Sequence, residues 1–257
     1  MTTHWRLDEH TALITGASKG IGAACARELA ELGADLLLVA RDLDRLEAIQ
    51  HELESEHPEQ QIRVFSADLG EHEDRLALMD WVVDLGSDLH LLINNAGGNI
   101  TRPALDYERS ELQALIELNV LGAFELSRLF HPQLSSHGRG AIVNVGSVSG
   151  LTHVRSGAPY GMTKAALHQL TRNLACEWAA DGIRVNAVAP WYIRTGRTDG
   201  LLADPAYLDE VLEHTPMGRI GEPAEVAAAI AFLCLPAASY VSGECIAVDG
   251  GFLRYGF

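Results

Sequence analysis

The sequence predicts an α/β domain, in which a mostly parallel sheet of about seven strands is covered by helices on both faces. Short β-rich runs alternate with longer segments that have the spacing of amphipathic helices. Runs such as LLLV (36–39) and AIVNV (141–145) are almost wholly apolar, which is typical of parallel strands buried on both faces. No Pro/Gly-rich linker, repeat or low-complexity tract interrupts this alternation, so we expect a single domain over residues 1–257.

The elements follow one another in a β-α order along the chain. The first strand, Ala12–Thr15, leads through a glycine-rich turn into a helix, and buried strands and helices then alternate. The other expected strands are Asp35–Arg41, Ile62–Ser66, Leu89–Ile93, Ala141–Val145, Arg184–Val188 and Cys245–Val248. The expected helices are Gly20–Leu32, Leu43–Glu56, Glu71–Leu85, Ser110–Leu134, Pro159–Ala180 and Glu222–Leu235. With right-handed crossovers, this order predicts a doubly wound, Rossmann-type sheet.

One segment, Trp191 to Gly221, looks irregular and is far longer than an ordinary connection. Long loops in compact domains often cover binding sites, so we expect a substrate loop at about 191–221.

Composition narrows the range of partners. With 19 basic and 35 acidic residues the net charge is −16, which argues against nucleic acid or an anionic membrane, and disfavours an acidic carrier protein. The four cysteines have no C-x-x-C spacing, and the chain shows neither a signal-like start nor an apolar run of membrane-spanning length. We therefore expect a cytoplasmic protein. Its acidity and scarcity of lysine fit either salt adaptation or codon bias.

The stretch TGASKGIG, residues 15–22, follows the first strand and opens a helix. Glycines allow close approach to a phosphate, and a helix N-terminus supplies free N–H groups and partial positive charge. The spacing G-x-x-x-G-x-G is neither a Walker loop nor the common G-x-G-x-x-G, but its position after the first strand predicts a dinucleotide site.

The end of the second strand indicates which dinucleotide is bound. An acidic residue there would bind the ribose 2′-hydroxyl of NAD, whereas an arginine accommodates the 2′-phosphate of NADP. The strand ends Val39-Ala40-Arg41, and Lys19 adds a second cation, so NADP(H) is expected over NAD(H). We interpret Asp42 as the start of the next helix.

Four residues form a candidate catalytic set: Asn119, Ser147, Tyr160 and Lys164. Tyr160 and Lys164 are four apart on a predicted helix and so share one face. Lys19 and Lys164 are the only lysines in the chain, which makes a Tyr-x-x-x-Lys pair unexpected by chance. Ser147 follows a buried strand, and Asn119 interrupts an apolar helix face.

Together, TGASKGIG, NNAG (94–97), Asn119, Ser147, YGMTK (160–164) and Pro190…Thr195 resemble the short-chain dehydrogenase/reductase family over nearly the whole chain. Within it, NNAGGNITRP and APWYIRT are most similar to tropinone reductase-like members. The resemblance implies that Tyr160 is the general acid/base, that Lys164 lowers its pKa and binds the nicotinamide ribose, that Ser147 holds the substrate oxygen, and that Asn119 positions a water in a relay to Lys164.

The resemblance also implies a cofactor site, in which Asp68 binds the adenine amino group and Ile193 and Thr195 hold the carboxamide. The full expected cofactor set is Gly16, Ser18, Lys19, Gly20, Ile21, Gly22, Arg41, Asp68, Leu69, Asn95, Ala96, Gly97, Tyr160, Lys164, Pro190, Ile193 and Thr195.

The family's usual Pro-Gly after the sixth strand is here Pro190-Trp191, followed by Tyr192. Either Trp191 merely packs against the loop, or these rings wall the substrate pocket. The expected substrate residues are Ser147, Tyr160, Leu151, Val154, Trp191 and Tyr192. Because no cation is evidently fixed toward a carboxylate, with Arg155 and Arg194 as loose candidates, we expect a small neutral ketone or alcohol.

Other readings remain open at this stage. The enzyme alternatives are a 3-oxoacyl carrier-protein reductase and a sugar or polyol dehydrogenase; the non-enzyme alternative is a catalytically inactive NADP(H)-sensing protein. The scattered histidines lack paired ligand spacing, so no catalytic metal is expected. The resemblance implies a homo-oligomer, a tetramer or a dimer.

Overall fold

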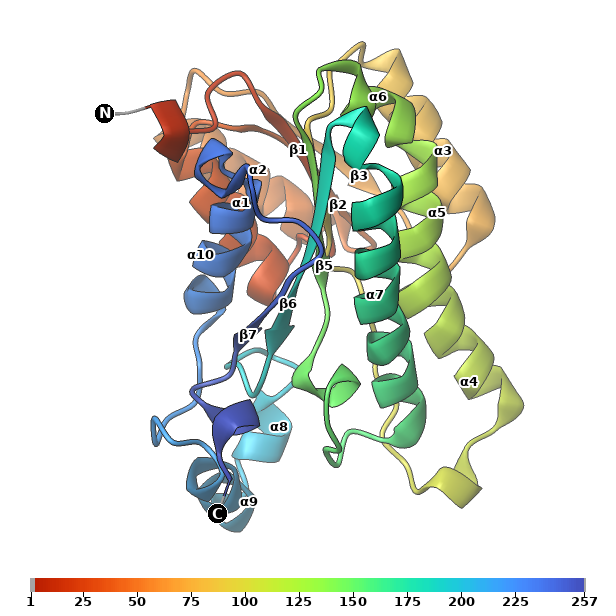
Figure 1. Cartoon of the computed structure of the whole chain (residues 1–257), viewed down its shortest axis with the longest axis vertical. Coiled ribbons are helices and arrows are strands. Elements are labelled where there is room, and N and C mark those ends of the chain that lie inside the picture. Colours follow the sequence, from red (N-terminus) through yellow and green to blue (C-terminus); the bar gives the residue numbers. More distant parts are fainter. Residues whose placement is uncertain (1–2, 257) are drawn as a thin grey trace.

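A computed structural model describes residues 3–256 and forms a seven-stranded sheet in the order β3-β2-β1-β4-β5-β6-β7 (Figure 1). Every adjacent pair of strands is parallel. The strands are β1 (Thr11–Thr15), β2 (Asp35–Ala40), β3 (Ile62–Ser66), β4 (Leu91–Asn94), β5 (Gly140–Val145), β6 (Ile183–Pro190) and β7 (Cys245–Val248). This confirms the predicted α/β fold and its doubly wound sheet.

Helices cover both faces of the sheet, as Figure 1 shows. One layer comprises α1 (Gly20–Glu31), α2 (Leu43–Glu56) and α10 (Pro223–Cys234). The opposite layer comprises α3 (His72–Asp84), α4 (Arg109–Ile116), α5 (Gly122–Leu129), α6 (His131–Ser136) and α7 (Ala158–Glu177).

Each face of the sheet has its own hydrophobic core, and successive side chains of β1 and β2 contribute alternately to the two cores. Ile14 and Leu38 pack beneath the α1/α10 layer, while their neighbours Leu13 and Leu37 pack beneath the other layer. Period-two alternation in a strand with two apolar faces produces this pattern, because successive side chains point to opposite sides of a sheet. The buried strands therefore act as a rigid platform for the loops at their ends.

The expected long helix Ser110–Leu134 is divided into several shorter elements in the structure. Helices α4 and α5 are joined by a π turn over Glu117–Leu121, and α6 follows after Phe130. The π turn contains the buried Asn119, and such turns are frequent at functional sites. Apolar periodicity alone could not distinguish this turn from regular helix.

The expected irregular segment 191–221 is also corrected. It contains two short helices, α8 (Asp199–Leu202) and α9 (Pro205–Glu213). Asp204 caps α9 by accepting from Ala206 N–H at 3.0 Å, and Pro205 begins the helix. The base of the segment is closed by a bridge between Ile193 and Gly221.

Candidate active site

The order of strands reverses between β1 and β4, and ligands of such sheets bind at the carboxyl ends of the strands beside that point. A cleft of about 550 Å³ lies there. Its walls are the loops after β1, β2, β3, β4, β5 and β6, together with the start of α7. Residues far apart in the sequence thus meet because parallel strands end at one edge.

The glycine turn forms one end of the cleft. Helix α1 has Lys19 at its N-cap with no side-chain cap, and its first turn has no acidic residue, so its N–H groups are available to an anion. Gly16 has φ +65° and Gly20 has φ +57°, a region that favours glycine. Gly22 does not line the cleft; a Cβ there would lie 2.2 Å from the carbonyl oxygen of Gly16.

Arg41 and Asp68 contact each other in this cleft, at 3.4 Å between Nη1 and Oδ2. Asp42 lies beside them but caps α2, because its carboxylate accepts from Arg45 N–H at 3.2 Å. Asp42 is therefore engaged as the sequence suggested. Lys19 and Arg41 provide two cations beside an open helix N-terminus, and this donor set fits the phosphates of a dinucleotide such as NADP.

Nearly all of the expected cofactor residues line this one cleft. Besides Lys19, Arg41 and Asp68, they are Gly16, Ser18, Gly20, Ile21, Leu69, Asn95, Ala96, Gly97, Tyr160, Lys164, Pro190, Ile193 and Thr195. Asn95 holds the turn together from below, since its Nδ2 donates to the carbonyl oxygens of Thr15 at 2.8 Å and Gly16 at 3.2 Å.

Ser147, Tyr160 and Lys164 meet at the other end of the cleft. Ser147 caps a short 3-10 turn after β5, and its hydroxyl accepts from Ser149 N–H at 3.1 Å. Burial raises the pKa of Tyr160, while the charge of Arg197 and a hydrogen bond with Ser147 oppose that rise. The two hydroxyls thus lie close enough to act on one substrate oxygen.

Lys164 is buried and donates from Nζ to the Val145 carbonyl oxygen at 2.8 Å. Burial, with a further contribution from the charge of Arg197, lowers its pKa to about 7. The cation that opposes burial at Tyr160 is Arg197, whereas the sequence had assigned that effect to Lys164. At neutral pH Lys164 can therefore both give and accept a proton, which suits a relay.

Asn119 lies behind this group and does not line the cleft. Its amide makes a pair of hydrogen bonds with the Gly98 backbone, at 2.8 and 3.0 Å, and donates to Thr163 Oγ1 at 3.1 Å. It thereby joins the π turn and α7 to the loop after β4. Its expected role in holding a water stays a prediction.

A buried histidine also supports the site, and sequence reasoning missed it. His168 lies one turn beyond Lys164 on α7, with Nε2 3.0 Å from the carbonyl oxygen of Ser147. Its Nδ1 lies 3.3 Å from Cys245 Sγ. Since a backbone carbonyl only accepts, Nε2 carries the proton. The spacing of four from Lys164 was the available signal.

Only part of the expected substrate set lies in the cleft. Ser147, Tyr160 and Trp191 line it, but Leu151, Val154 and Tyr192 do not. Leu151 is exposed, and Val154 lines a separate cavity of about 460 Å³. Tyr192 packs against Tyr207, with their hydroxyls hydrogen-bonded. The expected role of these three residues in binding substrate stays a prediction.

Trp191 both packs and faces the cleft, so the two readings of this residue are compatible. Its ring stacks on Phe252 at 3.7 Å between centroids, and Nε1 donates to Thr215 Oγ1 at 3.0 Å. These contacts join Trp191 to Phe252 near the C-terminus and to Thr215, and they hold the ring that lines the cleft.

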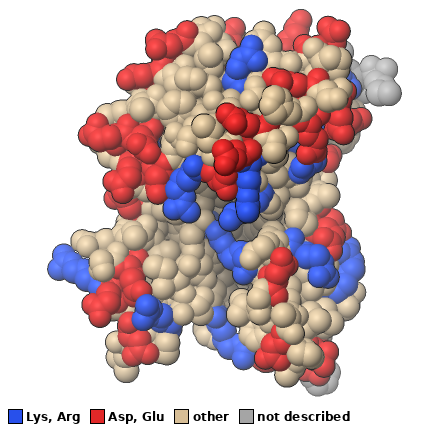
Figure 2. Space-filling view, turned by 180° about the vertical axis from the view of Figure 1, so that it is seen from behind, with Lys and Arg blue, Asp and Glu red and all other residues tan. Residues whose placement is uncertain are grey.

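Positive side chains are concentrated at the cleft despite the acidity of the chain. Lys19, Arg41, Lys164 and Arg197 line it, and the acidic residues among its lining are Asp42 and Asp68. On the face shown in Figure 2, Lys and Arg gather around a central hollow, while Asp and Glu are spread over the surrounding surface. The arrangement attracts an anionic ligand to an otherwise repulsive surface.

The geometry of a dinucleotide cleft with a Ser-Tyr-Lys group is that of an oxidoreductase, and the comparisons agree. A family profile described as enoyl-(acyl carrier protein) reductase matches residues 16–253. The chain belongs to the short-chain dehydrogenase/reductase family of oxidoreductases.

Particular relatives cover nearly the whole chain. A tropinone reductase homolog of Arabidopsis thaliana is 43% identical over 253 residues, which are 98% of this chain and 96% of the relative. The structure of a gluconate 5-dehydrogenase from Burkholderia cenocepacia in complex with NADP and tartrate has a TM-score of 0.93 at 31% identity, covering 99% of each chain. RhlG of Pseudomonas aeruginosa, in an NADP active-site complex, has a TM-score of 0.91 at 33% identity, covering 98% of this chain and 99% of its own.

Within residues 3–256, none of the helices combines the length and apolarity needed to cross a bilayer.

Proposed function

We propose that this protein is an NADP(H)-dependent oxidoreductase that interconverts a ketone and a secondary alcohol, with Tyr160 as general acid/base. The observation that carries the proposal is the meeting of Ser147, Tyr160 and Lys164 in the same cleft as the open N-terminus of α1. NADP(H), when bound, supplies or accepts the hydride.

In the reductive direction, Tyr160 donates its proton to the substrate oxygen while the Ser147 hydroxyl hydrogen-bonds to the same atom and stabilises its developing charge. Burial keeps Tyr160 protonated at neutral pH, since it raises the pKa of the phenol. Lys164, with a pKa of about 7, can then return a proton toward Tyr160. In the oxidative direction each proton moves the opposite way.

NADP(H) is proposed over NAD(H) because Arg41 and Lys19 lie in the cleft, while Asp42 is committed to capping α2. The NADP complexes of the gluconate 5-dehydrogenase and of RhlG agree with this choice. Arg41 is largely exposed and can turn from Asp68 to a phosphate.

A small ketone is the substrate class proposed from the sequence, and Trp191, Leu118 and Ile193 give the cleft apolar walls that suit one. Arg197 fits an uncharged substrate poorly. A second candidate, oxidation of a sugar or polyol, is favoured by the similarity to the gluconate 5-dehydrogenase. Carrier-protein substrates are disfavoured by the net charge of −16.

The test is a screen for NADPH consumption against ketones, 3-oxoacyl thioesters and keto-sugars, repeated with NADH and, for alcohols and polyols, with NADP⁺. We expect turnover of ketones with NADPH favoured over NADH. Tight NADPH binding without any turnover would instead support the NADP(H)-sensing alternative.

We also propose a cytosolic homo-oligomer. Strand β7 is the edge strand of the sheet and is only half-buried, which leaves backbone groups for another copy. Light scattering coupled to gel filtration would give the number of copies; a monomer at micromolar concentration would contradict the proposal.

A further inference from the structure

Arg197 is the charged residue in the cleft that the sequence did not single out. It follows Thr195 by two positions and lines the cleft together with Tyr160 and Lys164. Its Nη2 donates to the carbonyl oxygen of Gly97 at 2.5 Å. A Cβ on Gly97 would lie 3.5 Å from Lys164 Nζ, so this contact places the guanidinium beside the catalytic group.

The neighbouring arginines all have carboxylate partners. Arg155 pairs with Glu210 at 2.7 Å. Arg194 pairs with Glu222 at 3.1 Å, and Arg219 pairs with Glu225 at 2.5 Å. Within the part of the chain that the structure describes, Arg197 has no such partner. The two loose candidates for holding a substrate carboxylate, Arg155 and Arg194, are thus neutralised by glutamates.

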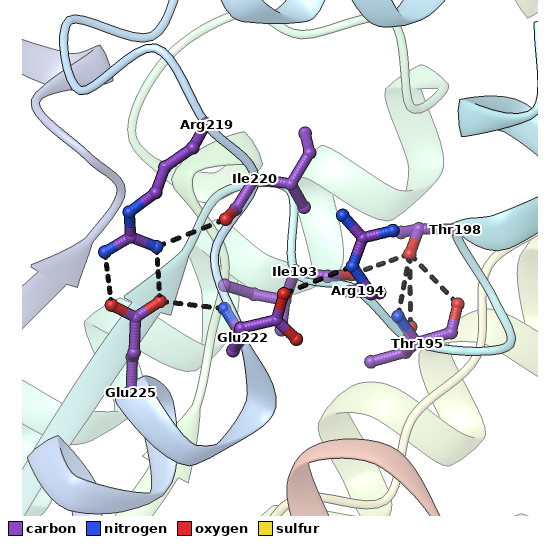
Figure 3. A network of polar contacts seen from close by, with 8 residues as sticks. All are labelled: Ile193, Arg194, Thr195, Thr198, Arg219, Ile220, Glu222 and Glu225. Carbon is purple, nitrogen blue, oxygen red and sulfur yellow. Dashed lines mark hydrogen bonds and ion pairs between the residues drawn. The ribbon is translucent and has the colours of Figure 1, made fainter.

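A fixed turn carries Arg197. Thr198 Oγ1 donates to Ile193 O at 2.6 Å and accepts from Thr195 N–H at 3.1 Å (Figure 3). Thr198 N–H also donates to Thr195 O at 2.9 Å, which closes the turn around Arg197.

The base of the segment is held as well. Arg194 N–H donates to Gly221 O at 2.8 Å. Figure 3 shows the ion pairs Arg194–Glu222 and Arg219–Glu225, which involve neighbouring residues. The hydrogen-bonded turn and the bridge between Ile193 and Gly221 hold the backbone on both sides of Arg197, while its side chain lines the cleft.

The chemistry of the guanidinium indicates what it binds. A guanidinium matches the two oxygens of a carboxylate in a planar, bidentate pair. Arg197 lines the same cleft as Tyr160, and its charge lowers the pKa of that phenol against the effect of burial. A carboxylate on Arg197 would therefore lie a few bonds from the carbon whose oxygen Tyr160 protonates.

We propose that Arg197 binds a carboxylate of the substrate next to the reacting carbonyl, so that the enzyme acts on an oxo acid and the corresponding hydroxy acid. This inference rests on the proposed function. It replaces the expectation of a neutral substrate, which depended on finding no cation directed at the site.

The test compares wild type with Arg197→Leu, Arg197→Lys and, as a control for an arginine that is paired with a glutamate outside the cleft, Arg155→Leu. The substrates are 2-, 3- and 4-oxo acids, each paired with its methyl ester. For the preferred acid, Arg197→Leu should lower kcat/KM about 100-fold, with the ester changed less than about threefold. Arg197→Lys should recover part of the loss, and Arg155→Leu should behave like wild type toward both acid and ester.

A guanidinium could also bind the diphosphate of the cofactor. Calorimetric measurement of NADPH binding distinguishes this role from binding of a substrate carboxylate. An unchanged Kd in Arg197→Leu supports the proposal. Equal loss on acid and ester with a Kd raised tenfold or more would assign Arg197 to the cofactor and overturn it, as would undiminished activity on the acid.

If wild type reduces neither acids nor esters, the proposed function fails. Arg197 is then still tested by calorimetric titration of 4-oxopentanoate into wild type and into Arg197→Leu. Binding that is lost in Arg197→Leu supports the carboxylate site, whereas equal binding or none in both proteins refutes it.

Discussion

Buried titratable groups occur at the carboxyl ends of the strands (the carboxyl edge of the sheet) and at their amino ends (the amino edge), but their roles differ. At the carboxyl edge, burial lowers the pKa of Lys164 to about 7 and raises that of Tyr160. At the amino edge, burial lowers the pKa of His90 to about 4. The physical cause is the same, because a low-dielectric surrounding disfavours the charged form.

The surroundings make the difference. His90 lies between the rings of His10 and His137, at 5.1 and 4.8 Å between centroids, and its Nδ1 accepts from Thr11 N–H at 3.2 Å. Lys164 and Tyr160 instead border a cleft. A perturbed pKa therefore indicates chemistry only where a ligand can reach the group; elsewhere it alters stability.

The strongest test of the carboxyl edge is Tyr160→Phe, which removes one hydroxyl and leaves the ring. We expect kcat to fall by about 10³-fold, the range for loss of a general acid, while NADPH binding changes little. Steady-state kinetics and calorimetry measure the two. Activity within tenfold of wild type would exclude Tyr160 as the proton donor.

Changing Lys164 tests the relay. Lys164→Arg keeps a charge but cannot release a proton near neutral pH, so turnover should fall roughly 100-fold. Near-normal turnover would refute the relay. Because Lys164 is buried and arginine is the larger side chain, Lys164→Met is a second variant, which should lose turnover similarly.

Lys164→Met also separates charge from packing through the pH dependence of unfolding. The folded pKa, about 7, lies below the unfolded value, so between pH 7 and 10 the unfolded chain binds the extra proton. Wild-type stability should therefore rise with pH relative to the variant, by at most about 1.4 kcal/mol per pH unit. Urea titrations at pH 7.5 and 9 measure the free energy of unfolding of both proteins. An equal change with pH in wild type and Lys164→Met would contradict the lowered pKa.

Replacing Arg41 tests how the cleft selects its cofactor. Arg41→Asp places a carboxylate beside Asp68, so it should repel a 2′-phosphate. The NADPH/NADH ratio of kcat/KM should fall by about 10- to 100-fold. Arg45→Asp, on the adjoining helix, serves as a control for general charge. An unchanged ratio in Arg41→Asp would show that the phosphate is bound elsewhere.

The smallest effect is expected at the amino edge, with His90→Asn. Asn can still accept from Thr11 N–H but does not titrate. Between pH 6.5 and 4 the unfolded histidine binds a proton that the folded one refuses, so wild type should lose stability on acidification faster than the variant, by up to about 1.4 kcal/mol per pH unit.

Activity of His90→Asn at pH 7 should match wild type, because His90 lies at the opposite edge from the cleft. Loss of activity in His90→Asn at pH 7, with stability unchanged, would contradict the conclusion that groups at the amino edge affect stability alone.

Sequence reasoning was sufficient for the strands and for the glycine turn, because buried parallel strands and phosphate turns leave local patterns. It could not place the π turn at Asn119 or α8 and α9, whose apolar spacing is short and ambiguous. It also missed Arg197. Only the structure shows that Arg194 and Arg155 pair with glutamates, whereas Arg197 has no carboxylate partner among the described residues.

The most direct test of the central claim is transfer of deuterium from [4-²H]NADPH to a ketone substrate found in the screen, in wild type and Tyr160→Phe. Mass spectrometry should locate deuterium from one face of the nicotinamide on the carbinol carbon of the wild-type product, with formation about 10³-fold slower in Tyr160→Phe. Product without deuterium from either labelled face, or equal rates in the two proteins, would contradict hydride transfer with Tyr160 as acid/base.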